Sequence, residues 1–213
     1  MTRTTLAATT LSLAVIAGPC PAEMITFAKD PAGSVPSDFE LGRTGDGGPG
    51  RWTVVRDDSA DGGHAIEQQS QDQNDYRFPL AIYRPLSGKD VDVQIRFKAI
   101  AGKIDRAGGI AVRLTSPDNY YVVRANALED NVRFYRVVAG KREQLATANV
   151  KVPSNEWHTL GLRAQGERFT ISFKGKELYS ATDKTFAAAG SVALWTKADS
   201  VTRFDKLDIN VRP

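Results

Sequence analysis

The residues best suited to chemistry lie in one stretch, residues 119–136, which reads NYYVVRANALEDNVRFYR. Its guanidinium, amide and phenol groups can all hydrogen-bond the hydroxyls of a sugar. Side chains alternate between the two faces of a strand, so polar and apolar residues here separate onto opposite faces. The polar outward-facing set is expected to be Tyr120, Arg124, Asn126 and, after a turn, Arg133 and Tyr135.

A second stretch near the C-terminus, VALWTKADSVTRFD, extends this surface. If Val192 and Leu194 point into the core, alternation turns Trp195 and Lys197 to the opposite face and leaves Asp199 at the strand end. An indole ring can stack on the C–H groups of a sugar. The predicted ligand-binding residues are therefore Arg113, Tyr120, Arg124, Asn126, Tyr135 and Trp195.

A purely structural interpretation of the same residues stays open. In that interpretation Trp195 packs beneath a loop, and the arginines pair with acids such as Asp199 and Glu129. A single β-bulge would also invert the expected facing of any of these strands.

Several other kinds of chemistry are not supported. There is no GxSxG motif for a serine nucleophile. His64 and His158 are far apart and lack the spacing of zinc ligands. No cofactor is therefore expected, although a divalent metal such as calcium stays open, because Asp118 and Asp130 could contribute oxygen ligands. The adjacent pair Glu129 and Asp130 falls in an expected turn and does not form a glycosidase dyad.

The periodicity of the chain is that of β-strands. Residues 91–97, VDVQIRF, and 169–173, FTISF, alternate apolar and polar side chains. Gly175 and Lys176 are expected to form the turn of a hairpin. We count about ten strands separated by turn signals and no convincing helix of ten residues or more. The predicted fold is all-β, a two-sheet antiparallel jelly-roll sandwich in one domain, residues 23–213.

The first 22 residues predict a secretory signal peptide. Arg3 precedes an apolar run of about a dozen residues, which is too short for a membrane span of roughly 20 residues. We expect cleavage after Ala22 and therefore a periplasmic or secreted protein. Cys20, the only cysteine, leaves a lipoprotein anchor as an alternative, although Pro19 stands where such sites have a small flexible residue.

The charge pattern argues against a nucleic-acid partner. Without Arg3, 27 of the 28 basic residues remain against 25 acidic residues, a net charge of about +2 with neutral histidines. Basic and acidic residues are interleaved, so no basic patch or arm is expected. No later apolar run in the mature chain is long enough to span a membrane. The oligomeric state cannot be inferred from this pattern.

Two segments carry a family resemblance: AGGIAVRLTSPDNYYVVRANALEDNVRFYRVVAGKREQLA and GSVALWTKADSVTRFD. They resemble exported bacterial concanavalin-like jelly-roll domains, formerly a domain of unknown function, that are associated with 3-keto-disaccharide hydrolases and 3-ketoglucoside lyases or hydratases. The resemblance spans about residues 75–209. It implies a concanavalin- or laminin-G-like sandwich with a carbohydrate or glycoside ligand.

The resemblance also implies a reaction. A ketone at sugar C3 acidifies the neighbouring C–H, so the glycosidic oxygen can leave by elimination. Such chemistry implies Asp199 or Glu129 as base and Lys197, Arg124 or Arg113 as stabiliser of the enolate. The alternatives are a non-catalytic carbohydrate-binding or adhesion-type module and, third, a structural envelope protein with no small ligand.

Overall fold

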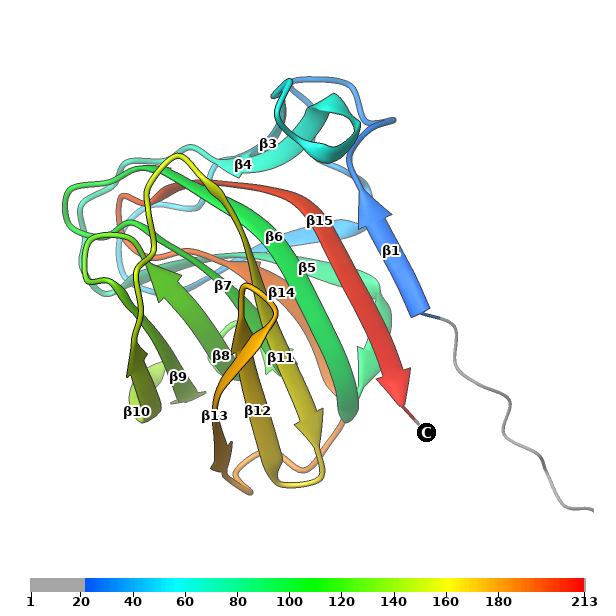
Figure 1. Cartoon of the computed structure of the whole chain (residues 1–213), viewed down its shortest axis with the longest axis vertical. Helices are drawn as coiled ribbons and strands as arrows, with labels where there is room; N and C mark the ends of the chain where they lie inside the picture. Colours follow the sequence, from blue (N-terminus) through cyan, green and yellow to red (C-terminus); the bar gives the residue numbers. More distant parts are fainter. Residues whose placement is uncertain (1–21, 213) are drawn as a thin grey trace, which may run out of the picture.

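The protein is described by a computed structural model covering residues 22–212, which form two antiparallel β-sheets packed face to face (Figure 1). The only helix in this part of the chain is a 3-10 turn, η1 (Asp61–Gly63). The expected all-β jelly-roll sandwich is therefore confirmed. Apart from Ala22, the expected signal peptide with Cys20 lies outside the described residues. Between residues 22 and 212, no helix has the length and apolarity to cross a membrane.

The first sheet, sheet A, has eight strands, and β15 runs through its centre. One edge of β15 pairs with β6, and the other edge pairs with β4 and with β1. The strands of sheet A are β13 (Lys176–Thr182), β12 (Arg168–Phe173), β11 (Trp157–Gln165), β6 (Asp90–Ala101), β15 (Val201–Arg212), β4 (His64–Gln68), β3 (Trp52–Arg56) and β1 (Ala22–Thr26).

The second sheet, sheet B, has seven strands, and β7 and β14 lie at its centre. It carries the first stretch that the sequence indicated for ligand binding and the start of the second, whose last residues lie in β15 of sheet A. In spatial order its strands are β10 (Lys141–Asn149), β9 (Asn131–Val138), β8 (Asn119–Asn126), β7 (Ala107–Ser116), β14 (Gly190–Trp195), β5 (Arg77–Gly88) and β2 (Phe39–Gly45).

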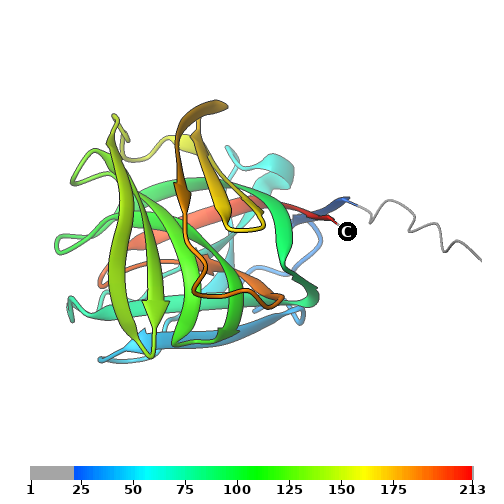
Figure 2. The same ribbon diagram turned by 90° about the horizontal axis from the view of Figure 1, so that it is seen from below.

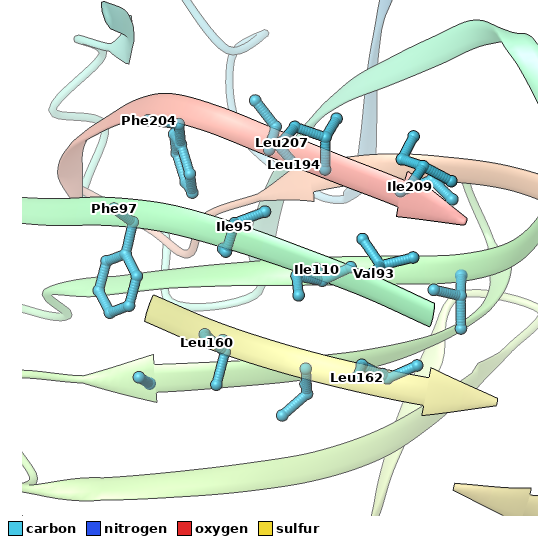
Figure 3. Close-up of a cluster of buried hydrophobic side chains, with 14 of the residues drawn as sticks. Val93, Ile95, Phe97, Ile110, Leu160, Leu162, Leu194, Phe204, Leu207 and Ile209 are labelled. Atoms are coloured by element: carbon cyan, nitrogen blue, oxygen red, sulfur yellow. The ribbon is translucent and has the colours of Figure 1, made fainter. Parts of the chain in front are cut away.

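The main core lies between the two sheets and follows from the alternation in the strands. The side chains of β6, β11 and β15 meet those of β7 and β14, as Figure 3 shows. Burial of each such aliphatic or aromatic side chain stabilises the fold by about 1.5–3 kcal/mol. The labelled members are Val93, Ile95, Phe97, Ile110, Leu160, Leu162, Leu194, Phe204, Leu207 and Ile209.

A second core fills the opposite, inner face of sheet B. Before its bulge, β7 carries only small residues on this face, Ala107, Gly109 and Ala111, and so leaves room for large rings from the neighbouring strands, whereas Leu114 joins this core at the bulge. A Cβ atom added to Gly109 would lie 2.6 Å from a backbone oxygen of β8, so this position needs glycine. The rings above the small residues include Phe78 and Trp195, stacked at 5.4 Å between their centroids.

Sheet B curves around these rings until its two edges approach each other. The indole of Trp195 donates to the hydroxyl of Tyr120, which bonds Thr44 on the far edge strand β2. The hydroxyl of Tyr76 bonds the tip of the β9–β10 hairpin, where it donates to Gly140 O and accepts from Arg142 N. Figure 2 shows the light-green hairpin reaching toward the blue strand β2.

The curvature has a local cause in the strands. Bulges interrupt the pairing of β7 with β8, β14 with both of its neighbours, and β10 with β9. A bulge bends its strand and increases the local twist. The inner face of sheet B is therefore a closed apolar layer.

Three expectations are corrected by the fold. The described residues contain fifteen strands, not about ten, because the polar region before residue 69 forms β1 to β4. The hairpin turn lies at Lys174 and Gly175, one residue earlier than expected, and both residues have positive φ. Trp195 lies on the face that alternation predicted, but that face is covered and the ring is fully buried.

Truncation of Trp195 is expected to destabilise the protein and not merely to remove a surface ring. Trp195→Ala should lower the free energy of unfolding by about 3–5 kcal/mol, because the cavity it leaves cannot refill. Urea unfolding monitored by circular dichroism measures this change. The exposed Val35→Ala should stay within about 0.5 kcal/mol of the parent. Equal stability of Trp195→Ala and the parent would contradict the closed inner face.

Candidate functional site

Polar side chains form a connected network at one end of the inner face of sheet B, beside the second core. Its members come from strands β8 and β9, the turn between them, the loop between β6 and β7, and the loop after β14. We call it the Arg124 cluster; it comprises Asp105, Arg124, Asn126, Glu129, Asn131, Arg133, Tyr135 and Lys197.

Arg124 is the centre of the network and is almost fully buried. Its guanidinium donates to the side-chain oxygen of Asn131, to Glu129 Oε2 at 2.8 Å and to the hydroxyl of Tyr135 at 3.3 Å. Arg133 lies directly across from Arg124 in the β8–β9 pairing and approaches the same Glu129 oxygen at 3.3 Å. One carboxylate therefore holds two guanidinium groups.

Asp105 and Lys197 form the buried side of the cluster. Lys197 Nζ lies 3.1 Å from Asp105 Oδ2 and also pairs with the exposed Asp75 from the loop between β4 and β5. Asn126 donates to Asp105 Oδ1 at 2.9 Å. The carboxylate of Asp105 is thus bonded on both oxygens.

The pKa values of the two carboxyl groups in the cluster, Asp105 and Glu129, shift in opposite directions. Burial raises the pKa of Asp105 above its usual range, although Lys197 and Arg124 act against this shift. Burial also opposes ionisation of Glu129, but Arg124 and a hydrogen bond from Asn131 outweigh it and lower the pKa of Glu129. Glu129 is therefore the negative charge that neutralises the two arginines.

The cluster opens to solvent at Glu129 and Arg133, whose side chains are 40% and 34% exposed. Beside them, the guanidinium carbon of Arg142 lies 4.5 Å from the centre of the Tyr135 ring and 4.7 Å from that of Phe78. Two buried nitrogens, Arg142 Nη1 and Arg124 Nε, have no hydrogen-bond acceptor within residues 22–212. Arg124 in the cluster and Arg142 beside it thus each keep one N–H donor that the described residues do not satisfy.

The structure brings together most of the residues that the sequence indicated. Arg124, Asn126, Tyr135, Glu129 and Lys197 all belong to the cluster, whereas Tyr120 and Trp195 lie buried in the adjacent second core. The expected stacking of a sugar on Trp195 is corrected by this burial.

Arg113 lies at the opposite end of strand β7 and does not join the cluster. It sits in the bulge between β7 and β8 with a φ of 50°, which turns its side chain toward the main core. There it stacks over Phe169 and donates to the carbonyls of Lys89, Gly166 and Phe186. Arg113 therefore ties three loops together, and its expected position beside Arg124 is wrong.

Asp199 has a structural role that the sequence did not indicate. Its carboxylate accepts hydrogen bonds from the backbone amides of Lys103, Ile104 and Asp105 at 2.7–3.2 Å. Burial works against ionisation, yet these amides lower the pKa of Asp199. Because its oxygens are already occupied by the backbone, Asp199 does not fit the expected role of a catalytic base.

Metal ligation finds no support in the described residues. Between residues 22 and 212, no group of three or more His, Cys, Asp or Glu side chains could hold a metal ion. Asp130 instead pairs with Lys151 and accepts from Val152 N. The ring of His158 bonds Pro153 O, and burial lowers its pKa.

Sequence reasoning missed three members of the cluster: Asp105, Asn131 and Arg133. Alternation did place Arg133 on the outward face, but nothing distinguished it from other surface arginines. Asp105 stands in a loop with no strand pattern, so only the fold brings it beside Lys197.

Comparison with known proteins identifies one matching family. The sequence profile of the galactocerebrosidase C-terminal lectin domain matches residues 90–212, more than half of the chain and all of the Arg124 cluster. No curated protein matches the chain in sequence.

Solved structures show the same fold at low sequence identity. The carbohydrate-binding module CBM66 from Bacillus subtilis has a TM-score of 0.63 at 19% identity, covering 78% of this chain and 94% of that chain. Domain 4 of AbnA, a GH43 extracellular arabinanase from Geobacillus stearothermophilus solved with arabinotriose, has a TM-score of 0.58 at 13% identity. That match covers 91% of this chain and 94% of that chain. The Bacillus licheniformis beta-glucanase has a TM-score of 0.57 at 12% identity, covering 92% of this chain and 100% of that chain.

The role of Asp199 can be tested through the pH dependence of stability. Asp199→Asn should cost about 1–3 kcal/mol at pH 7, because the backbone amides lose an ionised acceptor. The folded pKa of Asp199 lies below its unfolded value, so this stabilisation is present above about pH 4 and is lost as the pH falls further. Chemical unfolding of both proteins between pH 3 and 7 measures it. A constant difference across that range would contradict the assignment.

Proposed function

Because the chain belongs to the family of galactocerebrosidase C-terminal lectin domains, we propose that it is a carbohydrate-binding module whose ligand contacts the Arg124 cluster. The observation that carries the proposal is a buried polar network, inside the matched part of the chain, that reaches solvent at Glu129 and Arg133. Sugar hydroxyls both donate and accept, so they match a surface of carboxylate oxygens and guanidinium N–H groups.

Two further observations support this assignment. The guanidinium nitrogens of Arg124 and Arg142 that lack acceptors belong to side chains that lie against the ring of Tyr135. These nitrogens are themselves buried, so the groups that a ligand can reach directly are Glu129 and Arg133 beside them. Two of the structurally similar proteins are a carbohydrate-binding module and an arabinanase domain solved with arabinotriose.

Removal of Arg133 is expected to weaken glycan binding without unfolding the protein. Arg133→Ala should lower the affinity for the glycan about tenfold or more, because the variant loses a charge-assisted hydrogen bond to the sugar. A glycan microarray would first identify the bound sugar, and isothermal titration calorimetry would then measure the dissociation constants.

Arg163→Ala is the matched control. It removes the same charge from an exposed ion pair with Asp92 on sheet A, away from the cluster. Its affinity should equal that of the parent. Absence of binding to every glycan, or equal affinity in Arg133→Ala and the parent, would refute the assignment.

As a second candidate function, we propose that the chain acts on 3-keto-glycosides. The specific observation is the accessible carboxylate of Glu129 held between Arg124 and Arg133. In an elimination, Glu129 would take the proton from the carbon next to the ketone and the arginines would stabilise the enolate oxygen. The enolate would then form a carbon–carbon double bond as the glycosidic C–O bond breaks, and the departing oxygen would take a proton from water or from the protonated Glu129. The lowered pKa of Glu129 makes it a weak base, which suits only a C–H already acidified by a ketone.

This reaction predicts activity on keto sugars alone. The protein should release the aglycone from 3-keto-glucosides and not from the unoxidised parents, and Glu129→Gln should reduce kcat at least about a hundredfold. The assay follows aglycone release with and without added divalent metal. No release under any condition would leave the binding module as the function, and full activity in Glu129→Gln would contradict this base.

We also propose that the protein is exported. The support is the pattern of residues 1–22, in which Arg3 precedes a short apolar run and small residues precede Ala22. A site outside the cytoplasm is where a module of this family would meet extracellular carbohydrate.

A further inference from the structure

A shallow groove lies on the side of the sandwich where the chain passes from β2, an edge strand of sheet B, to β3, an edge strand of sheet A. The connection between these strands, residues 46–51, passes from sheet B to sheet A and forms the floor of the groove at Pro49 and Gly50. Hollows of about 400 and 520 Å³ lie on either side of this floor and share both residues. We call the two together the Gly50 groove.

The groove is positively charged and has no acidic lining residue. Arg43 lines one half and Arg51 the other. Within residues 22–212, no carboxylate oxygen lies within 4 Å of either guanidinium. In contrast, Arg136, which lines two hollows on the other side of the sandwich, is paired with both Glu143 and Asp183. Asp72, beside the floor, attracts Arg43 without forming an ion pair with it, so both groove guanidinium groups retain N–H donors for an external anion.

The remaining lining residues suit a sugar chain. Leu41 and Pro49 expose apolar surface, and Leu41 is 42% exposed at the rim. Gln71 and Ser70 add hydrogen-bonding groups on the other half. Apolar patches for sugar C–H groups next to amide and hydroxyl groups are the mixture that carbohydrate sites use.

The floor of the groove is rigid. The buried Arg77 donates to Gly48 O and Pro49 O at 2.6 and 2.7 Å, and it also donates to Ala198 O, next to Lys197. Asp72 accepts from Gly48 N at 2.6 Å. A ligand would therefore bind a surface that needs little ordering, which reduces the entropic cost of association.

We propose that the Gly50 groove is a second binding site, which takes an acidic polysaccharide, one that bears carboxylate or sulfate groups. Guanidinium groups pair with both anions in a bidentate geometry. Arg43 and Arg51 lie in different hollows, which share Pro49 and Gly50. This arrangement favours an extended polysaccharide that crosses the floor, and it is less suited to a single small sugar. This site is independent of the Arg124 cluster.

Binding to polygalacturonate, dextran sulfate and neutral dextran tests the site. The full chain should bind at least one of the two acidic polymers at low salt, weaken as salt rises, and bind dextran far less. The uronate and the sulfated polymer distinguish the two sources of negative charge. The double variant Arg43→Ala/Arg51→Ala should bind the acidic polymer about tenfold or more weakly, by isothermal titration calorimetry.

Two control variants keep the result specific. Arg56→Ala removes an exposed arginine, without an ion-pair partner in residues 22–212, from the far end of strand β3, outside the groove, and should bind as the parent does. Arg133→Ala, which alters the Arg124 cluster, should also leave this binding unchanged. An equal loss in Arg56→Ala would indicate attraction by net charge alone, and a loss in Arg133→Ala would place the polymer at the cluster. Either result, or no binding of any acidic polymer at low salt, would overturn the proposal.

Discussion

Packing of Trp195, Phe78 and Tyr120 inside the curve of sheet B is the contact on which the rest of the molecule depends. These rings occupy the space left by the small residues of β7. A chain of hydrogen bonds runs from the Trp195 indole through the Tyr120 hydroxyl to Thr44, from the middle of the sheet to its edge. Both sides of sheet B are therefore buried, one against sheet A and one against itself. A sandwich of this size gains a second core in this way without disulfides, which the described residues could not form because they contain no cysteine.

The same packing decides where polar chemistry can occur. Because apolar rings occupy the middle of the inner face, its charged residues collect at one end, where Glu129 and Arg133 remain in contact with water. Their buried partners fix these side chains in position, so the surface is preorganised. The Gly50 groove has a comparable arrangement, since buried Arg77 holds the backbone of Gly48 and Pro49, which lies between the partly exposed Arg43 of β2 and the exposed Arg51. In the cluster, buried Arg124 likewise holds the carboxylate of Glu129, beside which Arg133 lies.

Strand alternation predicted more of this arrangement than any motif did. It placed Tyr120, Arg124, Asn126, Tyr135 and Trp195 on one face of sheet B, and all five lie there. It did not predict that this face is closed, because closure depends on bulges and on contacts between strands far apart in the chain. The bulge at Arg113 inverted one strand locally and removed that residue from the site. Asp105 and the groove arginines lie in or beside connections, where sequence periodicity carries no information.

The most direct test of the account is the solvent exposure of Trp195. Protein labelled with 5-fluorotryptophan has three fluorine signals, from Trp52, Trp157 and Trp195, which Trp195→Phe would help to assign. The account predicts no change in the Trp195 signal between H2O and D2O, whereas Trp157, which is partly exposed on sheet A, should shift and serves as the internal control. A Trp195 signal that shifts as much as that of Trp157 would contradict the closed inner face and return the sugar-binding surface to the middle of sheet B.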